Sequence, residues 1–157
     1  MTINSNKYLS PLPAKVREII KTGAARNDIL QKVCVLLQEE IPAYDWVGFY
    51  LADPEKDREL VLGPYVGKPT EHIRIPFGSG ICGQSAESLE TFLVEDVSKE
   101  SNYLACSPTV QSEIVVPIIK WDKFVAELDI DSDRLAGIGS EDRRILEEIC
   151  KDLASLF

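Results

Sequence analysis

One cysteine stands where ordinary packing does not explain it. Cys106 lies in the polar, turn-rich stretch SNYLACSPTVQS, between Ala105 and Ser107. Buried structural cysteines usually border apolar sequence, and this one does not. An accessible thiolate is a strong nucleophile that can be oxidised reversibly. We therefore predict that Cys106 is a nucleophilic, redox-active cysteine.

Carboxylic acids follow this thiol along the chain. Asp129 and Asp131 lie two residues apart in ELDID, so both would point to the same face of a strand. Glu113 opens the apolar run EIVVP and could add a third acid to that face. Neighbouring acids raise each other's proton affinity, and a protonated acid can protonate an oxygen that a thiolate reaction releases. A solvated strand edge is the alternative interpretation.

The remaining cysteines differ in their surroundings. Cys82, in GICG, stands at the predicted start of a helix, where the helix dipole favours a thiolate, and both packing and function stay open for it. Cys34 and Cys150 border apolar helical stripes and are expected in the core. The chain contains no CxxC and a single histidine, His72. We therefore expect no metal site and no cofactor.

The surrounding elements predict one α+β domain over residues 14–157, preceded by a loose arm over 1–13, where Pro11 and Pro13 remove backbone donors. Helices are expected over 14–23, from residue 27, over 81–90 and from Ser140, and strands over 44–52, 58–67, 71–77, 91–96, 113–119 and 123–131. Strands clustered between helices predict a central antiparallel sheet with helices packed on one side. The long loop over 97–112 is typical of a binding loop.

Composition limits the partners. The chain has 157 residues, 45% of them hydrophobic, and a net charge of −9. Repulsion between like charges argues against nucleic acid and against an anionic membrane surface as partners. A cyclic nucleotide is a poor ligand, because no basic cluster is available for its phosphate. No stretch is apolar enough to span a membrane or to act as a signal peptide, so we expect a cytoplasmic protein with reduced thiols.

Several segments, in order along the chain, resemble one known family. They are DWVGFYLA, ELVLGPYVGKP, IRIPFGSGICG, VEDV, LACS, SEIVVP and ELDIDS. This ordered combination resembles the free methionine-(R)-sulfoxide reductases, small cytoplasmic enzymes built as a single GAF domain. The resemblance covers residues 27–156, and the family's fold is similar to the one predicted above. It implies reduction of the R-epimer of free methionine sulfoxide, and GAF domains are often homodimers.

The resemblance also implies roles for particular residues. Cys106 would attack the sulfoxide sulfur, release methionine and become a sulfenic acid, which a second thiol would convert to a disulfide for thioredoxin to reduce. Substrate would be held by three acids and two aromatic side chains: Glu113, Asp129, Asp131, Trp46 and Tyr50. One acid would be protonated to donate to the sulfoxide oxygen. From the residues alone the two aromatics could equally belong to the core.

One position departs from the family pattern. A cysteine that acts as a resolving thiol usually precedes the VRIP segment, and here that position is His72. Cys82 matches another family cysteine and could resolve Cys106 instead. Alternatively, thioredoxin or a low-molecular-weight thiol attacks the sulfenic acid directly, or turnover is lost and the domain is a non-catalytic small-molecule-binding or sensor module. His72 would lower the pKa of the Cys106 thiol if the two were neighbours, and would otherwise be a surface strand residue.

Overall fold

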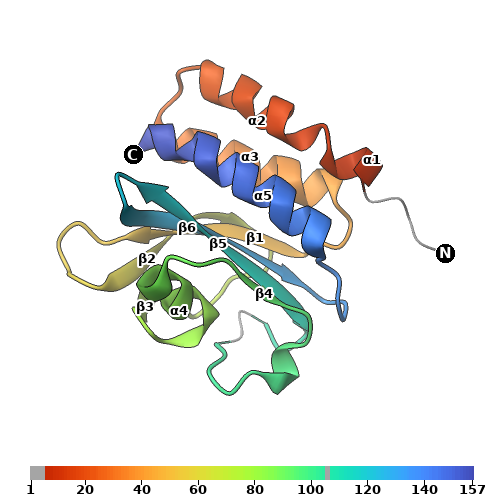
Figure 1. The fold of residues 1–157 in the computed structure, drawn as a ribbon, viewed down its shortest axis with the longest axis vertical. Coiled ribbons are helices and arrows are strands. Elements are labelled where there is room, and N and C mark those ends of the chain that lie inside the picture. Colours follow the sequence, from red (N-terminus) through yellow and green to blue (C-terminus); the bar gives the residue numbers. More distant parts are fainter. Residues whose placement is uncertain (1–5, 105–106) are drawn as a thin grey trace.

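The computed structural model describes residues 6–104 and 107–157, which form a six-stranded sheet between two layers of helices and loops (Figure 1). The helices are α1 (Asn6–Leu9), α2 (Leu12–Lys21), α3 (Arg26–Glu40), α4 (Gly80–Ser88) and α5 (Ser140–Leu153), with short 3-10 turns η1 (Val97–Lys99) and η2 (Ala154–Leu156). The strands are β1 (Trp46–Ala52), β2 (Glu59–Val66), β3 (Arg74–Pro76), β4 (Phe92–Val94), β5 (Ser112–Lys120) and β6 (Lys123–Ser132).

Every pairing in the sheet is antiparallel, in the order β3-β2-β1-β6-β5-β4. The hairpin between β5 and β6 turns at Trp121 and Asp122, whose φ values of 51° and 62° suit a tight two-residue turn. Strand β6 therefore lies in the middle of the sheet, between β1 and β5. The predicted α+β architecture with a central antiparallel sheet is confirmed.

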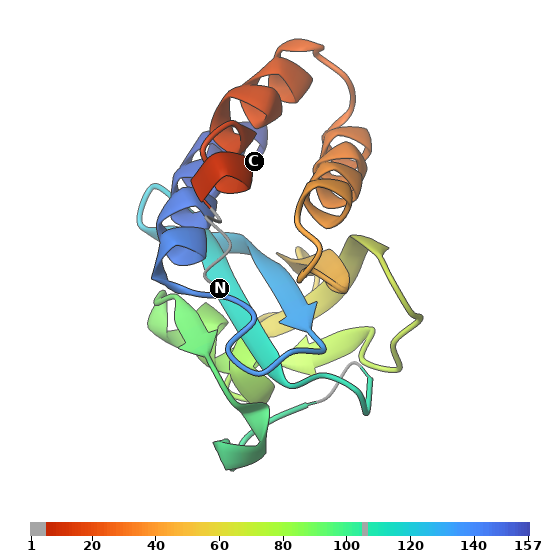
Figure 2. The ribbon, with the colours of Figure 1, turned by 90° about the vertical axis from the view of Figure 1, so that its right-hand side faces the viewer.

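The two faces of the sheet carry different side chains, because successive residues of a strand point to opposite faces. Figures 1 and 2 show α2, α3 and α5 over one face and α4 with the following connection over the other. On β6, Leu128 and Ile130 belong to the core beneath the three long helices. The residues between and beside them, including Asp129 and Asp131, therefore point to the α4 face.

The N-terminal segment differs from the loose arm expected over residues 1–13. Residues 6–9 form α1, α2 begins at Leu12, and Leu9 and Leu12 are buried in the main core. Pro11 and Pro13 lie at the start of α2, where the first residues of a helix need no N–H donor, so the prolines do not prevent the helix. From residue 6 onward this segment belongs to the domain.

None of the described helices combines the length and the apolar composition that crossing a bilayer requires.

A buried hydrogen bond connects the start of β1 to the start of α5. The Tyr44 hydroxyl donates to Asp142 Oδ1 at 2.5 Å, and the Gly139 backbone N–H donates to Asp142 Oδ2 at 2.9 Å. Burial and the Asp142 carboxylate raise the pKa of Tyr44 well above its ordinary value, so Tyr44 stays a donor. Asp142 thus caps α5 and joins it to the sheet.

Replacing Tyr44 by phenylalanine should lower the free energy of unfolding by about 1–3 kcal/mol, because one oxygen of a buried carboxylate loses its donor. Denaturant unfolding measures the change. Tyr8→Phe is the matched control, since Tyr8 is 46% exposed and should give less than about 0.5 kcal/mol. Equal effects of the two substitutions would show that this bond does not stabilise α5.

Candidate active site

Three acids predicted from the sequence meet on the α4 face of the sheet. Glu113 on β5 is the direct cross-strand partner of Asp131 on β6, and Asp129 follows on the same face of β6. Their exposed fractions are 3%, 1% and 0% in that order. The acids are therefore buried together, and they do not form a solvated strand edge.

A small cavity opens beside two of these acids. Its lining comes from five strands or helices and from the loop after η1: Tyr50, His72, Ile75, Ser79, Gly80, Ile81, Cys82, Leu104, Glu113 and Asp129. Its free volume of about 10 Å³ is enough for about one water molecule. Thiol, carboxyl and aromatic groups thus share an almost closed space.

A second, more open cavity of about 140 Å³ lies beside the third acid. It is lined by Asp45, Trp46, Lys68, Ser107, Thr109, Val110, Asp131 and Asp133. Leu104 lines the first cavity and Ser107 lines the second. Cys106, the predicted nucleophile, lies outside the described residues, but the described residues that flank it in the chain reach both cavities.

Burial and mutual repulsion make the acids hold protons. Burial, Asp129 and Asp131 together raise the pKa of Glu113 well above its ordinary value. Burial also raises the pKa of Asp129, while hydrogen bonding with Glu113 and with the Cys82 thiol offsets part of that rise. Two adjacent buried carboxylates cannot both be charged cheaply, so we expect the Glu113–Asp129 pair to hold a proton.

Cys82 lies where the sequence placed it, in the first turn of α4. It is 6% exposed, and its thiol reaches the carboxyl groups of Asp129 and Glu127. Ligand atoms of Cys82, Glu113 and Asp129 lie within 4.8 Å of one another, a spacing that a metal ion could also bridge. A shared proton and the thiol hydrogen also explain why these side-chain atoms lie so close together. We call Cys82, Glu113 and Asp129 the thiol–carboxyl cluster.

The predicted aromatic residues fill the space between the two cavities. The Tyr50 hydroxyl donates to the His72 carbonyl at 2.7 Å, and Trp46 Nε1 donates to the Lys68 carbonyl at 3.0 Å. The Trp46 ring stacks on Tyr65, with ring centroids 5.4 Å apart. His72 precedes β3, is half-buried and lines the first cavity, so it is not the exposed strand residue of the alternative interpretation.

Comparison with known proteins agrees with this arrangement. The GAF domain family model matches residues 23–157. The free methionine-R-sulfoxide reductase of Escherichia coli is 35% identical over 155 residues, which cover 99% of this chain and 92% of that protein. This chain belongs to the GAF-domain free methionine-R-sulfoxide reductase family.

Two solved structures extend the comparison within this reductase family. The free methionine-R-sulfoxide reductase from Neisseria meningitidis in complex with its substrate is 32% identical, with a TM-score of 0.93 over 100% of this chain and 92% of that chain. The type II free methionine-R-sulfoxide reductase from Thermoplasma acidophilum is 37% identical, with a TM-score of 0.79 over 83% of this chain and 91% of that chain. Family membership makes this chain an oxidoreductase.

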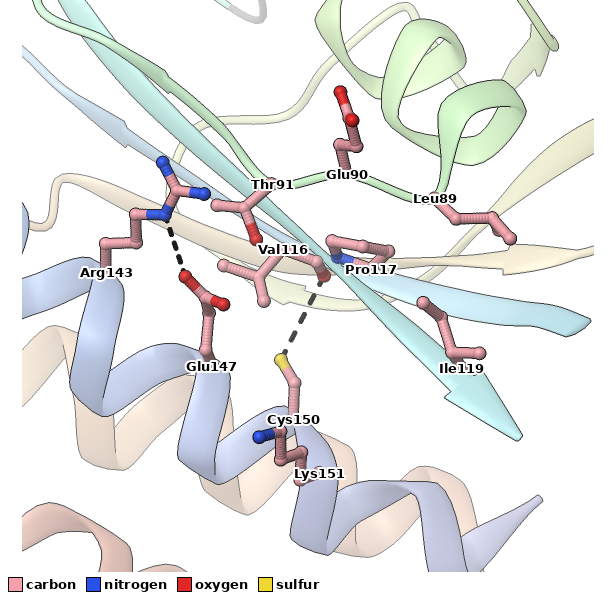
Figure 3. A pocket seen from close by; sticks show the side chains of 10 residues that line it. All are labelled: Leu89, Glu90, Thr91, Val116, Pro117, Ile119, Arg143, Glu147, Cys150 and Lys151. Atoms are coloured by element: carbon pink, nitrogen blue, oxygen red, sulfur yellow. Dashed lines mark hydrogen bonds and ion pairs between the residues drawn. The ribbon is translucent and has the colours of Figure 1, made fainter. Parts of the chain in front are cut away.

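A larger groove lies elsewhere. It measures about 710 Å³ between α5, β5 and the turn after α4, and it contains Cys150 (Figure 3). The Cys150 thiol is directed at the Val116 carbonyl, and burial raises its pKa far above the ordinary value, so this thiol stays protonated. Cys34 is buried with a raised pKa as well. Size alone therefore does not identify the reactive site of this reductase-family domain.

Two residues of the site were not predicted from the sequence. Glu127 is the first letter of ELDID and lies on the α4 face two residues before Asp129, so the same alternation could have found it. Asn102 connects the long loop to α4: its Oδ1 accepts from the Gly80 N–H and its Nδ2 donates to the Gly78 carbonyl, both at 2.8 Å. No local sequence pattern indicates these hydrogen bonds of Asn102.

Replacing Asn102 by alanine should loosen the loop, because the Gly80 N–H and the Gly78 carbonyl both lose their partner. Losing these two hydrogen bonds should cost about 1–2 kcal/mol. This cost would raise the fraction of molecules with the loop detached from α4 roughly 5- to 30-fold. Limited trypsin digestion at the exposed Lys99 measures this opening. The exposed Asn27, changed to alanine, is the control, and identical cleavage rates for the two variants would contradict the anchoring role.

Replacing Glu113 by glutamine should stabilise the protein increasingly as pH rises. Because the folded pKa lies above the ordinary value of 4.5, folded wild type holds a proton that the unfolded chain loses, so its free energy of unfolding falls as pH rises from 4.5 toward the raised pKa. Glutamine has no such proton, and its amide can donate to Asp129. The stability difference should grow by up to about 1.4 kcal/mol per pH unit in that window.

Denaturant unfolding at several pH values between about 5 and 8 tests this expectation. The surface substitution Glu18→Gln is the matched control, because Glu18 has a 74% exposed side chain. A difference between Glu113→Gln and wild type that stays flat across this range would show that Glu113 does not hold a proton in the folded state.

Proposed function

We propose that this protein reduces free methionine-(R)-sulfoxide to methionine, with Cys106 as the nucleophile. The observation that carries the proposal is the buried, proton-holding pair of Glu113 and Asp129 beside the thiol of Cys82. A proton kept inside a nearly dry cavity is what the reduction of a sulfoxide oxygen requires. The names of the relatives described above, including one solved with its substrate, support the choice of substrate.

The chemical step balances with the groups at hand. The Cys106 thiolate attacks the sulfoxide sulfur while the proton shared by Glu113 and Asp129 moves to the sulfoxide oxygen. The oxygen then moves to the Cys106 sulfur: a sulfur–oxygen bond to Cys106 forms, the substrate's sulfur–oxygen bond and the transient sulfur–sulfur bond break, methionine leaves, and Cys106 becomes a sulfenic acid. The substrate sulfur is reduced by two electrons and the cysteine sulfur is oxidised by two.

Substrate would occupy the two cavities and contact the aromatic side chains between them. Asp131, in the open cavity, would bind the substrate ammonium, and Trp46 and Tyr50 would contact the methyl–sulfur end. A free volume of about 10 Å³ does not admit an amino acid, so the first cavity must widen on binding. Leu104 is the side chain whose displacement would open it, because it is the cavity's lining residue from the long loop.

Chain geometry supports Cys82 as the resolving thiol. Leu104 lines the same cavity as Cys82, and Cys106 follows Leu104 by two residues in the sequence. A disulfide needs the two Cα atoms within roughly 4.4–6.8 Å. Thioredoxin or a low-molecular-weight thiol would then reduce the disulfide in the cytoplasm. His72 lines this cavity too and is proposed to modulate the thiols.

A non-catalytic binding or sensor module is the competing function. The nearly closed first cavity and the histidine at position 72 favour it, because a binder needs neither turnover nor the usual resolving cysteine. The thiol–carboxyl cluster favours the enzyme, because a buried thiol next to two proton-sharing acids brings only a cost to a simple binding site. A homodimer is proposed for either function.

Purified protein should reduce free methionine-(R)-sulfoxide, and not the S-epimer, with dithiothreitol or thioredoxin as the electron donor. Cys106→Ser should lower turnover at least about 1,000-fold with both donors, because the nucleophile is lost. Cys82→Ser should lower turnover with thioredoxin more than with dithiothreitol, which can attack the sulfenic acid directly. Cys34→Ser is the matched control.

Chromatographic measurement of methionine formed is the assay. Absence of turnover with either donor, combined with binding of the sulfoxide by calorimetry, would replace the enzyme by the binding module. Equal loss in Cys34→Ser and Cys106→Ser would remove Cys106 from the reaction.

A further inference from the structure

A third buried acid lies beside the thiol of Cys82. Glu127 on β6 has no exposed surface, and neither of its carboxyl oxygens has an N–H or O–H donor among the described residues. Burying a carboxyl group without such donors costs free energy, and a native protein keeps it only where something compensates. The interaction that reaches Glu127 comes from the Cys82 thiol.

The surroundings of Glu127 separate it from the acids proposed to act on the sulfoxide. Glu127 pairs across the sheet with Tyr50 on β1 and Pro117 on β5, whereas Glu113 pairs with Asp131. The Cys82 thiol, on α4, reaches Glu127 on one side and Asp129 on the other.

Glu127 faces titratable groups from its own strand and from neighbouring elements. These groups are Cys82 from α4, Asp129 from β6 and Tyr50 from β1, with Glu113 from β5 behind Asp129. His72, before β3, lines the same cavity as Cys82. Among the described residues that line that cavity there is no Lys or Arg, so neither an ammonium nor a guanidinium group offsets the charge of its carboxyl groups.

We propose that Glu127 is the positioning residue and proton acceptor for Cys82 when Cys82 resolves the sulfenic acid. This inference rests on the proposed function. The Glu127 carboxylate takes the proton from the Cys82 thiol, and the Cys82 sulfur attacks the Cys106 sulfur. A sulfur–sulfur bond forms, the sulfur–oxygen bond of the sulfenic acid breaks, and the departing hydroxyl leaves as water with that proton. Each sulfur changes by one electron, Cys82 being oxidised and Cys106 reduced.

Burial suits Glu127 for this transfer. Burial, with a further contribution from Asp129, raises the pKa of Glu127 well above its ordinary value, and the Cys82 thiol offsets part of the rise. An exposed glutamate is a far weaker base than a thiolate, since their ordinary pKa values are about 4.3 and 8.5. The raised pKa of Glu127 brings it closer to the pKa of a thiol. Proton transfer between two groups is efficient when their pKa values are similar.

Glu127 therefore completes a division of roles along one strand. Asp129, with Glu113, holds the proton that the first chemical step uses. Glu127 handles the proton of the second step, at the other side of the Cys82 thiol. Two successive proton transfers thus use two carboxyl groups on the same face of β6.

Single-turnover kinetics with the full chain test the proposal. Protein is mixed with methionine-(R)-sulfoxide without reductant, and quenched samples are analysed by mass spectrometry for methionine, dimedone-trapped sulfenic acid and the Cys82–Cys106 disulfide. Glu127→Gln should still form the sulfenic acid but make the disulfide at least about 10-fold more slowly near pH 7. Raising the pH toward the ordinary thiol pKa of about 8.5 should restore much of the rate.

Two variants control for packing and for loss of charge. Glu127→Leu removes the buried polar group altogether and should slow the disulfide as Glu127→Gln does, even if it is more stable. Glu59→Gln removes another buried acid, one that pairs with Lys56 at 2.7 Å away from the first cavity, and should leave the disulfide rate unchanged. Wild-type disulfide rates in both Glu127 variants would overturn the proposal.

A second measurement is independent of turnover. In a Cys106→Ser background, iodoacetamide alkylation of Cys82 is followed by peptide mass spectrometry, with the same protein unfolded in denaturant as the reference for an accessible Cys82 thiol. Glu127→Gln should slow alkylation of Cys82 in the folded protein several-fold near pH 7 relative to that reference. An unchanged ratio would overturn the role of Glu127, whereas absence of methionine formation in wild type would overturn only the proposed function.

Discussion

The structure depends on keeping a row of acids out of water on one face of its central strand. Every second residue of β6 from Glu127 to Asp131 is a carboxylic acid, and the residues between them belong to the main core. Charge in such a place is expensive, so burial raises the affinity of these acids for protons. The thiol on α4, the nearly closed cavity and the anchored loop all lie beside this row of acids.

Stability and chemistry make opposite demands on this face. The thiol–carboxyl cluster is more costly to bury at neutral pH than apolar residues of the same size would be. The helix-covered face offsets that cost, with its continuous apolar packing of α2, α3 and α5 and the Tyr44–Asp142 bond. The sheet thus separates a stabilising side from a reactive side, although both belong to the same strands.

Period-two alternation in the sequence was enough to predict the antiparallel sheet and the convergence of Asp129 and Asp131, because strand side chains have only two directions. It also contained Glu127, which was overlooked. Contacts between distant segments were beyond local patterns, as the Asn102 anchor shows. The helix predicted over 14–23 is α2, but α1 and the first residues of α2 were not predicted, because Pro11 and Pro13 were interpreted as helix breakers although a helix tolerates proline in its first turn.

The central position of β6 has a consequence for how the protein matures during synthesis. Strand β1 is made early, yet its neighbour in the sheet is β6, which pairs Trp46 with Asp131 and emerges from the ribosome near the end of translation. Such long-range pairing forms slowly. Until it forms, Cys82 belongs to a nascent chain without its carboxyl neighbours, so the thiol–carboxyl cluster is assembled only when β6 has been made and paired.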